Sequence, residues 1–585
     1  MRLKLLVPVC AVGTTLALVG CSQPAEQAPA QPAAPPAAAA APTLGIKPFG
    51  TADPNFKPDY SSLPPELQKT FTYIDEHIDE HAENLRKWIQ QPSISNSGEG
   101  IPESAEMVKG FYEELGCQDA RVVDTGITEY GSPGNPIVYA KCDFGAPKTV
   151  AVWWQYDTMP VTQPDNWIAP PFEARVVDGQ TAVVPTASRV IIGRGATNSK
   201  GGEMATLNAF RSLKAVMGTL PVNLIFVAEG DEERMDIGLR KFFQDHSDLM
   251  QEADVLWGGG GSEGCVYVEL TTSGTSWGRG PTISDIHGVN KRTVDSPAWR
   301  HIKMLSSLIS DDGNTPLIKG WFENKEAPTP AEVAQMKEQA KNMDLVAMAK
   351  SNGVARYIHD TPYEVLKDGR FETSFNLDGI WGGNMYAGGA GAILPNKVTS
   401  KHNIRYVPRM MGLDIVKKIR AQLDANGYKD VEMKLIGDVP WSRGTKNPDN
   451  DMTLAHRKAG DYMAQVGLGG QRRFGADGAA AARIADPNFL NDEAASANLG
   501  GYWPSYLWAD GEVGEKVGTI AIPMGSGGGG GGGGRAHAAN EYYTVESLNK
   551  SGGMASAEKS AAAALFEFAK ITNVPPKPKT PAKAQ

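Results

Sequence analysis

Residues 222–233 have the sequence VNLIFVAEGDEE, and this stretch decides the fold. The run 222–228 is short, apolar and rich in branched side chains, which is typical of a strand buried inside a parallel sheet. Four acidic side chains follow it at once, namely Glu229, Asp231, Glu232 and Glu233. Open α/β sheets place their ligand sites where strands end. The stretch therefore predicts a buried strand with a polar site at its end.

Strands and helices alternate on both sides of this stretch. Two further short apolar runs, 150–154 and 253–257, predict buried strands. The spacing of apolar residues predicts helices over 67–90 and 203–216, and an Ala-rich helix over 557–571. This rhythm predicts an α/β fold with a mixed, mostly parallel sheet flanked by helices.

The pattern changes near residue 270. Residues 297–309 and 414–423 predict helices, 330–350 predicts one long polar helix, and 372–377 and 397–406 predict strands. We therefore expect an inserted α+β domain that divides the α/β domain into two parts. The predicted signal covers 1–20 and the linker covers 21–63. The first α/β part covers 64–270, the inserted domain 271–437 and the second α/β part 438–572, and a disordered tail follows at 573–585.

The N-terminus predicts a targeting segment. A short basic region precedes an apolar stretch, 5–18, that is too short to span a bilayer comfortably. The following Leu18-Val19-Gly20-Cys21 resembles a bacterial lipobox, which implies cleavage before Cys21, its lipidation, and an anchor in the cell envelope. Ser22 favours the outer membrane, facing the periplasm. The alternative is a secretory signal with a chance cysteine. The Ala/Pro-rich linker is an extended spacer.

Composition narrows the function classes. The chain has 585 residues, 41% apolar and 21% charged, and a net charge of -10 without a basic block, which argues against a nucleic-acid partner. Cys117, Cys142 and Cys265 remain in the mature body and lack metal-type spacing. One disulfide and three buried free thiols are both open, and we favour the free thiols.

Four segments with polar residues lie at predicted strand ends or turns. They are VAVWWQYDTMP at 150–160, GRGATNSKGG at 193–202, VAEGDEE at 227–233 and GRAHAANEYY at 534–543. In the third segment, adjacent Glu232 and Glu233 can divide two tasks, one binding a cation and the other acting as general base. A solvated acidic turn is the alternative, but the buried strand before it favours a functional role.

The ordered set of motifs is similar to that of metallopeptidase family 20, the carnosinase, aminoacylase and desuccinylase group. Q-Y-D, W-x3-PF, GRG-x4-KG, EG-x-EE, D-I-H, I-R-Y-V-P and R-A-H-A-x-N-E recur in that order over about residues 65–570. The resemblance implies a catalytic α/β domain split by a ferredoxin-like lid that often dimerises. It also implies hydrolysis of an amide beside a free carboxylate, with two zinc ions and an activated water.

Five positions keep the residues that the resemblance expects. Glu232 takes the place of the general base, and Glu233 and His537 take those of zinc ligands. Asp157 matches the acid that orients the first metal histidine. His287 matches the lid histidine that stabilises the oxyanion across a dimer.

Three ligand positions depart from the family pattern. Gln155 replaces a histidine, Asn198 replaces the bridging aspartate, and Gly260 lies where another aspartate is expected. Neutral amides are poor zinc ligands, and bridging two divalent ions needs an anionic carboxylate. We therefore expect no ordinary two-zinc centre. One alternative is a weak single zinc or other divalent ion on Glu233 and His537, aided by Asn198, Gln155 or Asp157. The other alternative is water activation by Glu232 without metal.

The predicted function is hydrolysis of small peptides or N-acyl amino acids, with Arg405 as a candidate for binding the substrate carboxylate and a homodimer formed through the lid. The alternative is a lipoprotein that binds such ligands without catalysis. Retention of Glu232, His287 and His537 favours the enzyme, whereas the three departures favour the binding protein.

Other patterns are weaker. His77-Ile78-Asp79-Glu80-His81 fits a zinc-binding spacing on a helix, but a polar helix face is the better interpretation. Ser199 and Lys200 are neighbours that do not face each other on a helix, which argues against a nucleophile pair. The glycine run 527–534 fits a loop over the site and a low-complexity surface loop equally well. Four tryptophans are candidates for lining an apolar pocket, namely Trp153, Trp154, Trp381 and Trp503. Aromatic residues near strand ends more often belong to the core.

Overall fold

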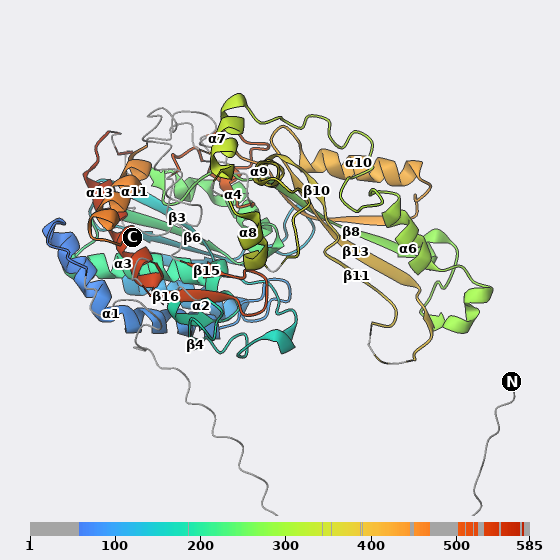
Figure 1. Ribbon diagram of the computed structural model, residues 1–585, viewed down its shortest axis with the longest axis horizontal. Helices are drawn as coiled ribbons and strands as arrows, with labels where there is room; N and C mark the ends of the chain where they lie inside the picture. Colours follow the sequence, from blue (N-terminus) through green and yellow to red (C-terminus); the bar gives the residue numbers. More distant parts are fainter. Residues whose placement is uncertain are drawn as a thin grey trace, which may run out of the picture. The chain divides into compact units, whose positions relative to one another are not determined.

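The computed structural model describes residues 58–573 and 576–577, apart from short breaks and one longer one (Figure 1). The breaks lie at 185–186, 342, 353, 386–387, 389, 445–449, 469–500, 509–510, 519, 525–531 and 549–551. The predicted signal, the predicted lipidation site at Cys21 and most of the linker lie outside the described residues. No helix among the described residues is long and apolar enough to cross a membrane.

A five-stranded mixed sheet forms the centre of the α/β part. Its order is β1-β2-β6-β3-β7, with β1 at Asp119–Val123, β2 at Ile137–Cys142, β6 at Asn223–Glu229, β3 at Thr149–Gln155 and β7 at Val255–Leu256. β6, β3 and β7 run parallel, whereas β1 and β2 are antiparallel additions. Strand predictions at 150–154, 222–228 and 253–257 are confirmed. The fold class, a mixed sheet flanked by helices, is confirmed as well.

Helices cover one face of this sheet with a large apolar core. They are α1 (Pro65–Gln90), α2 (Ile101–Leu115), α3 (Gly201–Met217), α11 (Asp451–Gln465) and α13 (Met554–Lys570). α3 packs against α1 and α13, and α11 packs against α13 (Figure 1). Alternation along β3 sends Val150, Val152 and Trp154 into this core. On the opposite face, Ala151 and Trp153 pack with residues of α4 (Ile237–His246) and with Trp503, and Gln155 contacts Glu232.

A second sheet has the order β10-β13-β8-β14. β8 is Gly264–Ser273, β13 is Lys397–Tyr406, β14 is Glu432–Val439 and β10 is Ser374–Phe375, while β11 (Gly379–Trp381) pairs with β13. Helices α6 (Pro297–Ser306) and α10 (Gly412–Ala425) pack against it. The predicted boundaries at 270 and 437 fall inside β8 and β14. The division into domains therefore stays a prediction, with limits that would move to about these strand ends.

The long helix predicted over 330–350 is two helices. α7 spans Pro330–Ala340 and α8 spans Leu345–Asn352. Asp344 explains the second start, because its Oδ1 accepts the N–H of Val346 and so favours a new helix beginning there. A third helix, α9 at Pro362–Phe371, packs against α7.

A four-stranded sheet, β15-β16-β5-β4, brings the C-terminal part of the chain next to the glycine-rich turn at 193–195. β4 is Arg175–Asp178, β5 is Ala187–Ile192, β15 is Gly533–Gly534 and β16 is Tyr542–Ser547. Of the glycine run, only 532–534 is described. A Cβ at Gly533 would lie 2.0 Å from Thr197 Oγ1, so this glycine is needed for a close approach to that turn.

The cysteine prediction was wrong in part. Cys117, after α2, forms a disulfide with Cys142 at the end of β2, whereas Cys265 on β8 is a buried free thiol. Composition could not decide the pairing, because it depends on the antiparallel addition of β1 and β2, which places the end of α2 beside the end of β2.

Candidate active site

The cluster of interest forms where β3 and β6 end side by side. The two strands are parallel and in register, with Gln155 opposite Glu229. The chain then makes a short 3-10 turn at Glu232–Arg234. This register explains how residues more than seventy positions apart in sequence come together at one edge of the sheet.

Gln155 contacts the predicted general base. Its Nε2 donates to Oε2 of Glu232 over 3.2 Å, and its backbone N–H donates to Glu203 Oε1. Glu232 is only 9% exposed. Burial, followed by the charge of Glu233, raises the pKa of the Glu232 carboxyl well above its usual value. The amide of Gln155 therefore provides a hydrogen-bond donor to a carboxyl group that is mostly removed from water.

Asp157 holds the turn that carries both glutamates. Its Oδ1 accepts the backbone N–H of Glu232 and its Oδ2 accepts that of Glu233, over 3.3 and 3.1 Å. The side chain is fully buried, and burial with the charges of Glu233 and Asp231 raises its pKa to about 8. The contacts of Asp157 thus order the two glutamates, and its predicted task of orienting a histidine has no counterpart at Gln155.

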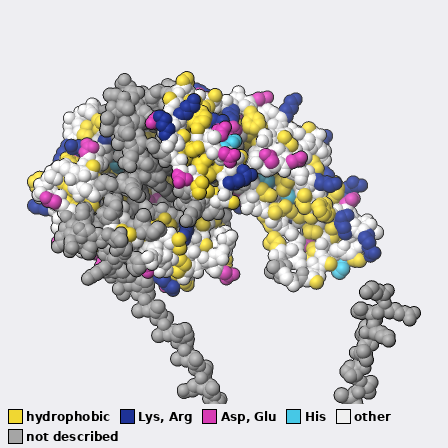
Figure 2. Space-filling view, in the orientation of Figure 1, with side chains coloured by type: hydrophobic (Ala, Val, Ile, Leu, Met, Phe, Trp, Pro, Cys, Tyr) yellow, Lys and Arg dark blue, Asp and Glu magenta, His cyan; other side chains and the backbone are white. Residues whose placement is uncertain are grey.

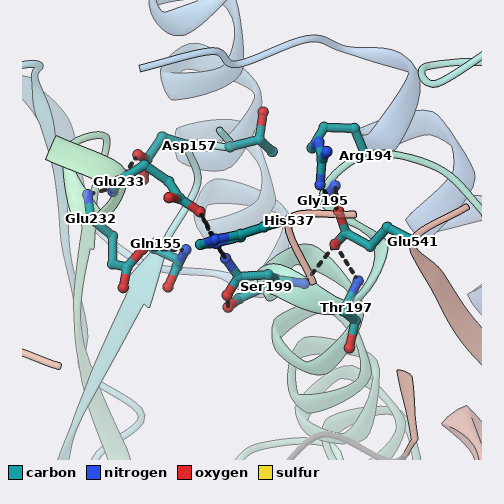
Figure 3. A network of polar contacts seen from close by, with 12 residues as sticks. Gln155, Asp157, Arg194, Gly195, Thr197, Ser199, Glu232, Glu233, His537 and Glu541 are labelled. Atoms are coloured by element: carbon teal, nitrogen blue, oxygen red, sulfur yellow. Dashed lines mark hydrogen bonds and ion pairs between the residues drawn. The ribbon is translucent and has the colours of Figure 1, made fainter. Parts of the chain in front are cut away.

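Glu233, Asn198 and His537 contact one another pairwise, and Figure 3 shows the side chains of Glu233 and His537 side by side. His537 Nε2 lies 2.8 Å from Glu233 Oε1. Asn198 Nδ2 donates to the same Glu233 oxygen over 2.8 Å and lies 3.0 Å from His537 Nε2. The imidazole nitrogen can donate to Glu233 or accept from Asn198, depending on its proton. The hydrogen bond with Glu233 raises the pKa of His537 above its usual value.

Aromatic residues absent from the predicted catalytic set lie next to Glu232. Tyr502 donates its hydroxyl to the backbone oxygen of Glu232 over 3.0 Å. The neighbouring Trp503 faces Trp153 at a centroid distance of 5.8 Å. Trp154 instead belongs to the core, and Trp381 is exposed on β11. Only two of the four candidate tryptophans thus lie together, because β3 alternates its side chains.

Arg405 already has a carboxylate partner. Its Nη1 donates to Glu263 over 2.9 Å, its Nε donates to Asn403, and its guanidinium lies 4.8 Å from the ring of Tyr502. The chain from Arg405 through Tyr502 to Glu232 places it near the cluster. Its role with a substrate carboxylate stays a prediction.

His287 makes its hydrogen bonds within its own segment. It lies on β9 (Ile286–His287), which pairs with β12 (Ile393–Leu394). Its Nδ1 accepts the N–H of Val289, and its backbone oxygen accepts from Asn290. These contacts leave it outside the network of Glu232 and His537 within one chain, and its assigned role across a dimer stays a prediction.

The two weaker sequence patterns, His77 with His81 and Ser199 with Lys200, do not form sites in the structure. His81 is buried and contacts Glu558 of α13, whereas His77 contacts Tyr73 one turn earlier. Lys200 donates to the backbone oxygens of Trp88 and Gln91, away from the Ser199 hydroxyl, which contacts Asn198. Neither pair forms the alternative site. Gly260 has φ of 139°, a conformation that an aspartate rarely adopts.

Fold and cluster together combine an α/β sheet with adjacent carboxylates at its strand ends and a histidine that contacts one of them. The profile of peptidase family M20/M25/M40 matches residues 155–555. The chain therefore belongs to this family, and it is an amide-bond hydrolase of the peptidase class.

Individual relatives agree with this assignment. The β-Ala-His dipeptidase of Rattus norvegicus is 27% identical over 423 residues, covering 67% of this chain and 81% of the relative. The Cys-Gly metallodipeptidase DUG1 of Candida albicans is 26% identical over 519 residues, covering 83% and 95%.

Solved structures share the fold. Human carnosine dipeptidase 1 aligns with a TM-score of 0.65 and 21% identity, covering 86% of this chain and 100% of that one. The dipeptidase Dug1p of Saccharomyces cerevisiae aligns with a TM-score of 0.64 and 23% identity, covering 87% and 99%.

The residues at the cluster do not fit a pair of zinc ions. Zinc takes imidazole, thiolate or carboxylate ligands at about 2.0–2.3 Å. Here an amide nitrogen, Nδ2 of Asn198, faces both Glu233 and His537, which also contact each other directly. Throughout the described ranges, no group of three or more His, Cys, Asp or Glu side chains is arranged to hold a metal ion.

Proposed function

We propose that the protein hydrolyses small peptides or N-acyl amino acids that carry a free carboxylate. The dipeptidase names of its relatives support the small-peptide substrate. The observation that carries the proposal is the position of Glu232, a buried carboxyl group at the strand ends with an amide donor at 3.2 Å. A base in such a position can activate one water molecule that is shielded from the bulk.

The proposed reaction proceeds through the chain's own groups. Glu232 takes a proton from water while the water oxygen bonds to the carbonyl carbon of the substrate amide. The resulting oxyanion accepts hydrogen bonds from donors of the cluster, for which Asn198 Nδ2 and protonated His537 are the candidates. The proton then passes from Glu232 to the leaving nitrogen as the carbon–nitrogen bond breaks. The amide side chains at two ligand positions support this route over one through zinc.

The first test is the variant Glu232→Gln of the full-length protein, assayed on a panel of dipeptides and N-acyl amino acids. We expect kcat to fall about 10²- to 10⁴-fold, because a carboxamide cannot accept the proton of water. Glu558→Gln is the control, since it neutralises another fully buried glutamate that contacts His81 and not the cluster. Retention of turnover in Glu232→Gln would refute the assignment of the base.

Chelation separates the routes. Turnover that survives removal of divalent ions supports the metal-free reaction, and turnover that is lost points to a single metal ion on Glu233 and His537. Absence of turnover on the whole panel, together with measurable ligand binding, would favour the binding protein. The substituted residues Gln155 and Asn198 support that alternative, because they replace metal ligands of the family.

We further propose that the protein is anchored in the bacterial envelope, on the periplasmic side of the outer membrane. The lipobox-like sequence around Cys21 supports the anchor. The Cys117–Cys142 disulfide supports an oxidising compartment.

A homodimer through the second sheet is our third proposal at this level. Large apolar side chains on α6 and β11 are exposed, with Trp299 at 59%, Ile302 at 45%, Ile380 at 46% and Trp381 at 38%. Figure 2 shows hydrophobic side chains on the visible face in the region of these elements. Exposed apolar groups of this kind are typical of protein interfaces.

A further inference from the structure

Glu541 is a buried carboxylate that joins two separate parts of the candidate site. It lies directly before β16 and four residues after His537, and its side chain is fully buried. Sequence reasoning gave it no role, although it belongs to the same A-H-A-x-N-E motif as His537. Its side chain points into the turn that carries Arg194, Gly195 and Thr197 (Figure 3).

Four donors converge on this carboxylate. Oε1 accepts the backbone N–H groups of Thr197 and Asn198, each over 2.9 Å. Oε2 accepts the N–H of Gly195 over 3.1 Å and Nη1 of the buried Arg194 over 2.6 Å. Backbone N–H groups gathered in a turn form a nest for an anion. The nest of the GRG motif is therefore filled by the chain's own glutamate, not open to a substrate anion.

This arrangement closes a loop of contacts around the cluster. The backbone of Asn198 is held by Glu541, and the side chain of Asn198 contacts Glu233 and His537. His537 lies in the same connection between β15 and β16 that ends with Glu541. We propose that Glu541 is a positioning residue that fixes the Asn198 amide relative to His537 and Glu233, and so sets the donors available to the reaction. This role rests on the proposed function for its effect on turnover.

Glu546 offers a matched control on the same pair of strands. It lies on β16, and its Oε2 accepts from Nε of Arg189 on β5 over 2.9 Å. Arg189 is buried like Arg194. Arg189 and Glu546 lie on β5 and β16 themselves, whereas Arg194 follows β5 and Glu541 precedes β16. The contacts of Glu546 do not include the turn at residues 194–198.

The experiment compares Glu541→Gln with Glu546→Gln in the full-length protein, using amide hydrogen exchange and steady-state kinetics. In Glu541→Gln we expect the peptide covering residues 194–200 to exchange at least about 10-fold faster, because its N–H groups lose a charged acceptor. We expect kcat to fall about 100-fold with KM changed less than threefold, since displacement of a group by about 1 Å can cost that much. Glu546→Gln should leave both quantities near the wild-type values.

Equal exchange of residues 194–200 in the wild type and Glu541→Gln would overturn the proposal, as would faster exchange with unchanged kcat. Should Glu541→Gln fail to fold, Glu541→Asp keeps the charge beside Arg194 on a shorter side chain, and the same two readouts apply. A wild-type protein without turnover would refute the proposed function only, because the exchange measurement still tests whether Glu541 holds the turn.

Discussion

At the scale of single residues, two carboxamides determine the character of the site. The Gln155 amide donates a hydrogen bond to Glu232, and the Asn198 amide donates one to Glu233. A carboxamide supplies a hydrogen-bond donor without a charge, so it partly compensates a buried carboxylate where a cation would compensate it fully. Each of the two glutamates is therefore held in part by an amide donor, and Glu233 also contacts the imidazole of His537.

Asn198→Asp tests this account. The substitution removes the donor and places a second carboxylate beside Glu233, so a divalent ion becomes the favourable partner. We expect the variant to retain zinc after dialysis and to gain about 3 kcal/mol of stability at zinc concentrations near 100 times its Kd. Elemental analysis and thermal unfolding with and without zinc measure this.

Asn540→Asp is the control for that experiment. Asn540 is near His537 in sequence, but its side chain bonds the backbone of Asn166 and Ile168. Zinc retention that is the same in the wild type, Asn198→Asp and Asn540→Asp would show that Asn198 does not decide metal affinity.

At the scale of elements, the register of β3 against β6 decides which residues meet. Because the strands are parallel and Gln155 lies opposite Glu229, the turn after β6 brings Glu232 onto Gln155. The antiparallel addition of β2 to β6 then determines where the chain ends of α2 and β2 come together, and there the Cys117–Cys142 disulfide forms.

The disulfide gives a prediction at this scale. We expect reduction to lower the free energy of unfolding by about 3 kcal/mol, because the bond closes a loop with a sequence separation of 25. Urea unfolding with and without reductant measures the difference, and a variant with serine at both positions should not respond to reductant. An equal response of wild type and variant would contradict the prediction.

The same bond reports on location. Cells are lysed directly into denaturant that contains a thiol-labelling reagent and no reductant. The reagent should then modify Cys265 and leave Cys117 and Cys142 unlabelled. A Cys21→Ala variant should lose its membrane association if Cys21 is the lipidated anchor. Labelling of all three cysteines in the native chain would argue against an oxidising compartment.

At the scale of the whole molecule, the candidate site is incomplete without a second chain if His287 contributes to it. Within one chain, the hydrogen bonds of His287 are made inside its own segment. A twofold dimer exchanges equivalent groups between its subunits, so each site would receive one His287.

Complementation tests this arrangement. Glu232→Gln and His287→Ala are each expected to be nearly inactive, but their co-expression should restore about one quarter of the wild-type activity. Random pairing makes half of the dimers mixed, and one of the two sites in each mixed dimer is intact. Activity that stays at the level of the separate variants, in a sample shown to be dimeric by sedimentation, would exclude a shared site.

Chain order and local pattern were enough to predict the buried strands of the central sheet, the helices at 67–90 and 557–571 and the family, but the pattern at 330–350 merged two helices into one. Apolar runs such as 224–228 are buried because their side chains gain by leaving water, and the spacing of motifs depends only on chain order. The sequence also indicated Glu232, Glu233 and His537, because acidic and imidazole groups at strand ends carry chemistry. It could not place the strand at 264–273 relative to its partners, since pairing depends on contacts distant in sequence.

Only the tertiary structure decided the roles of polar groups toward one another. Asn198 could equally have offered an oxygen to a metal, and the three-dimensional arrangement turns its nitrogen toward Glu233. Arg405 and Glu541 acquired their partners, Glu263 and the turn at Asn198, from segments more than a hundred residues away. Hydrogen bonds form between groups that meet in space, and their partners follow from packing that local sequence patterns do not contain.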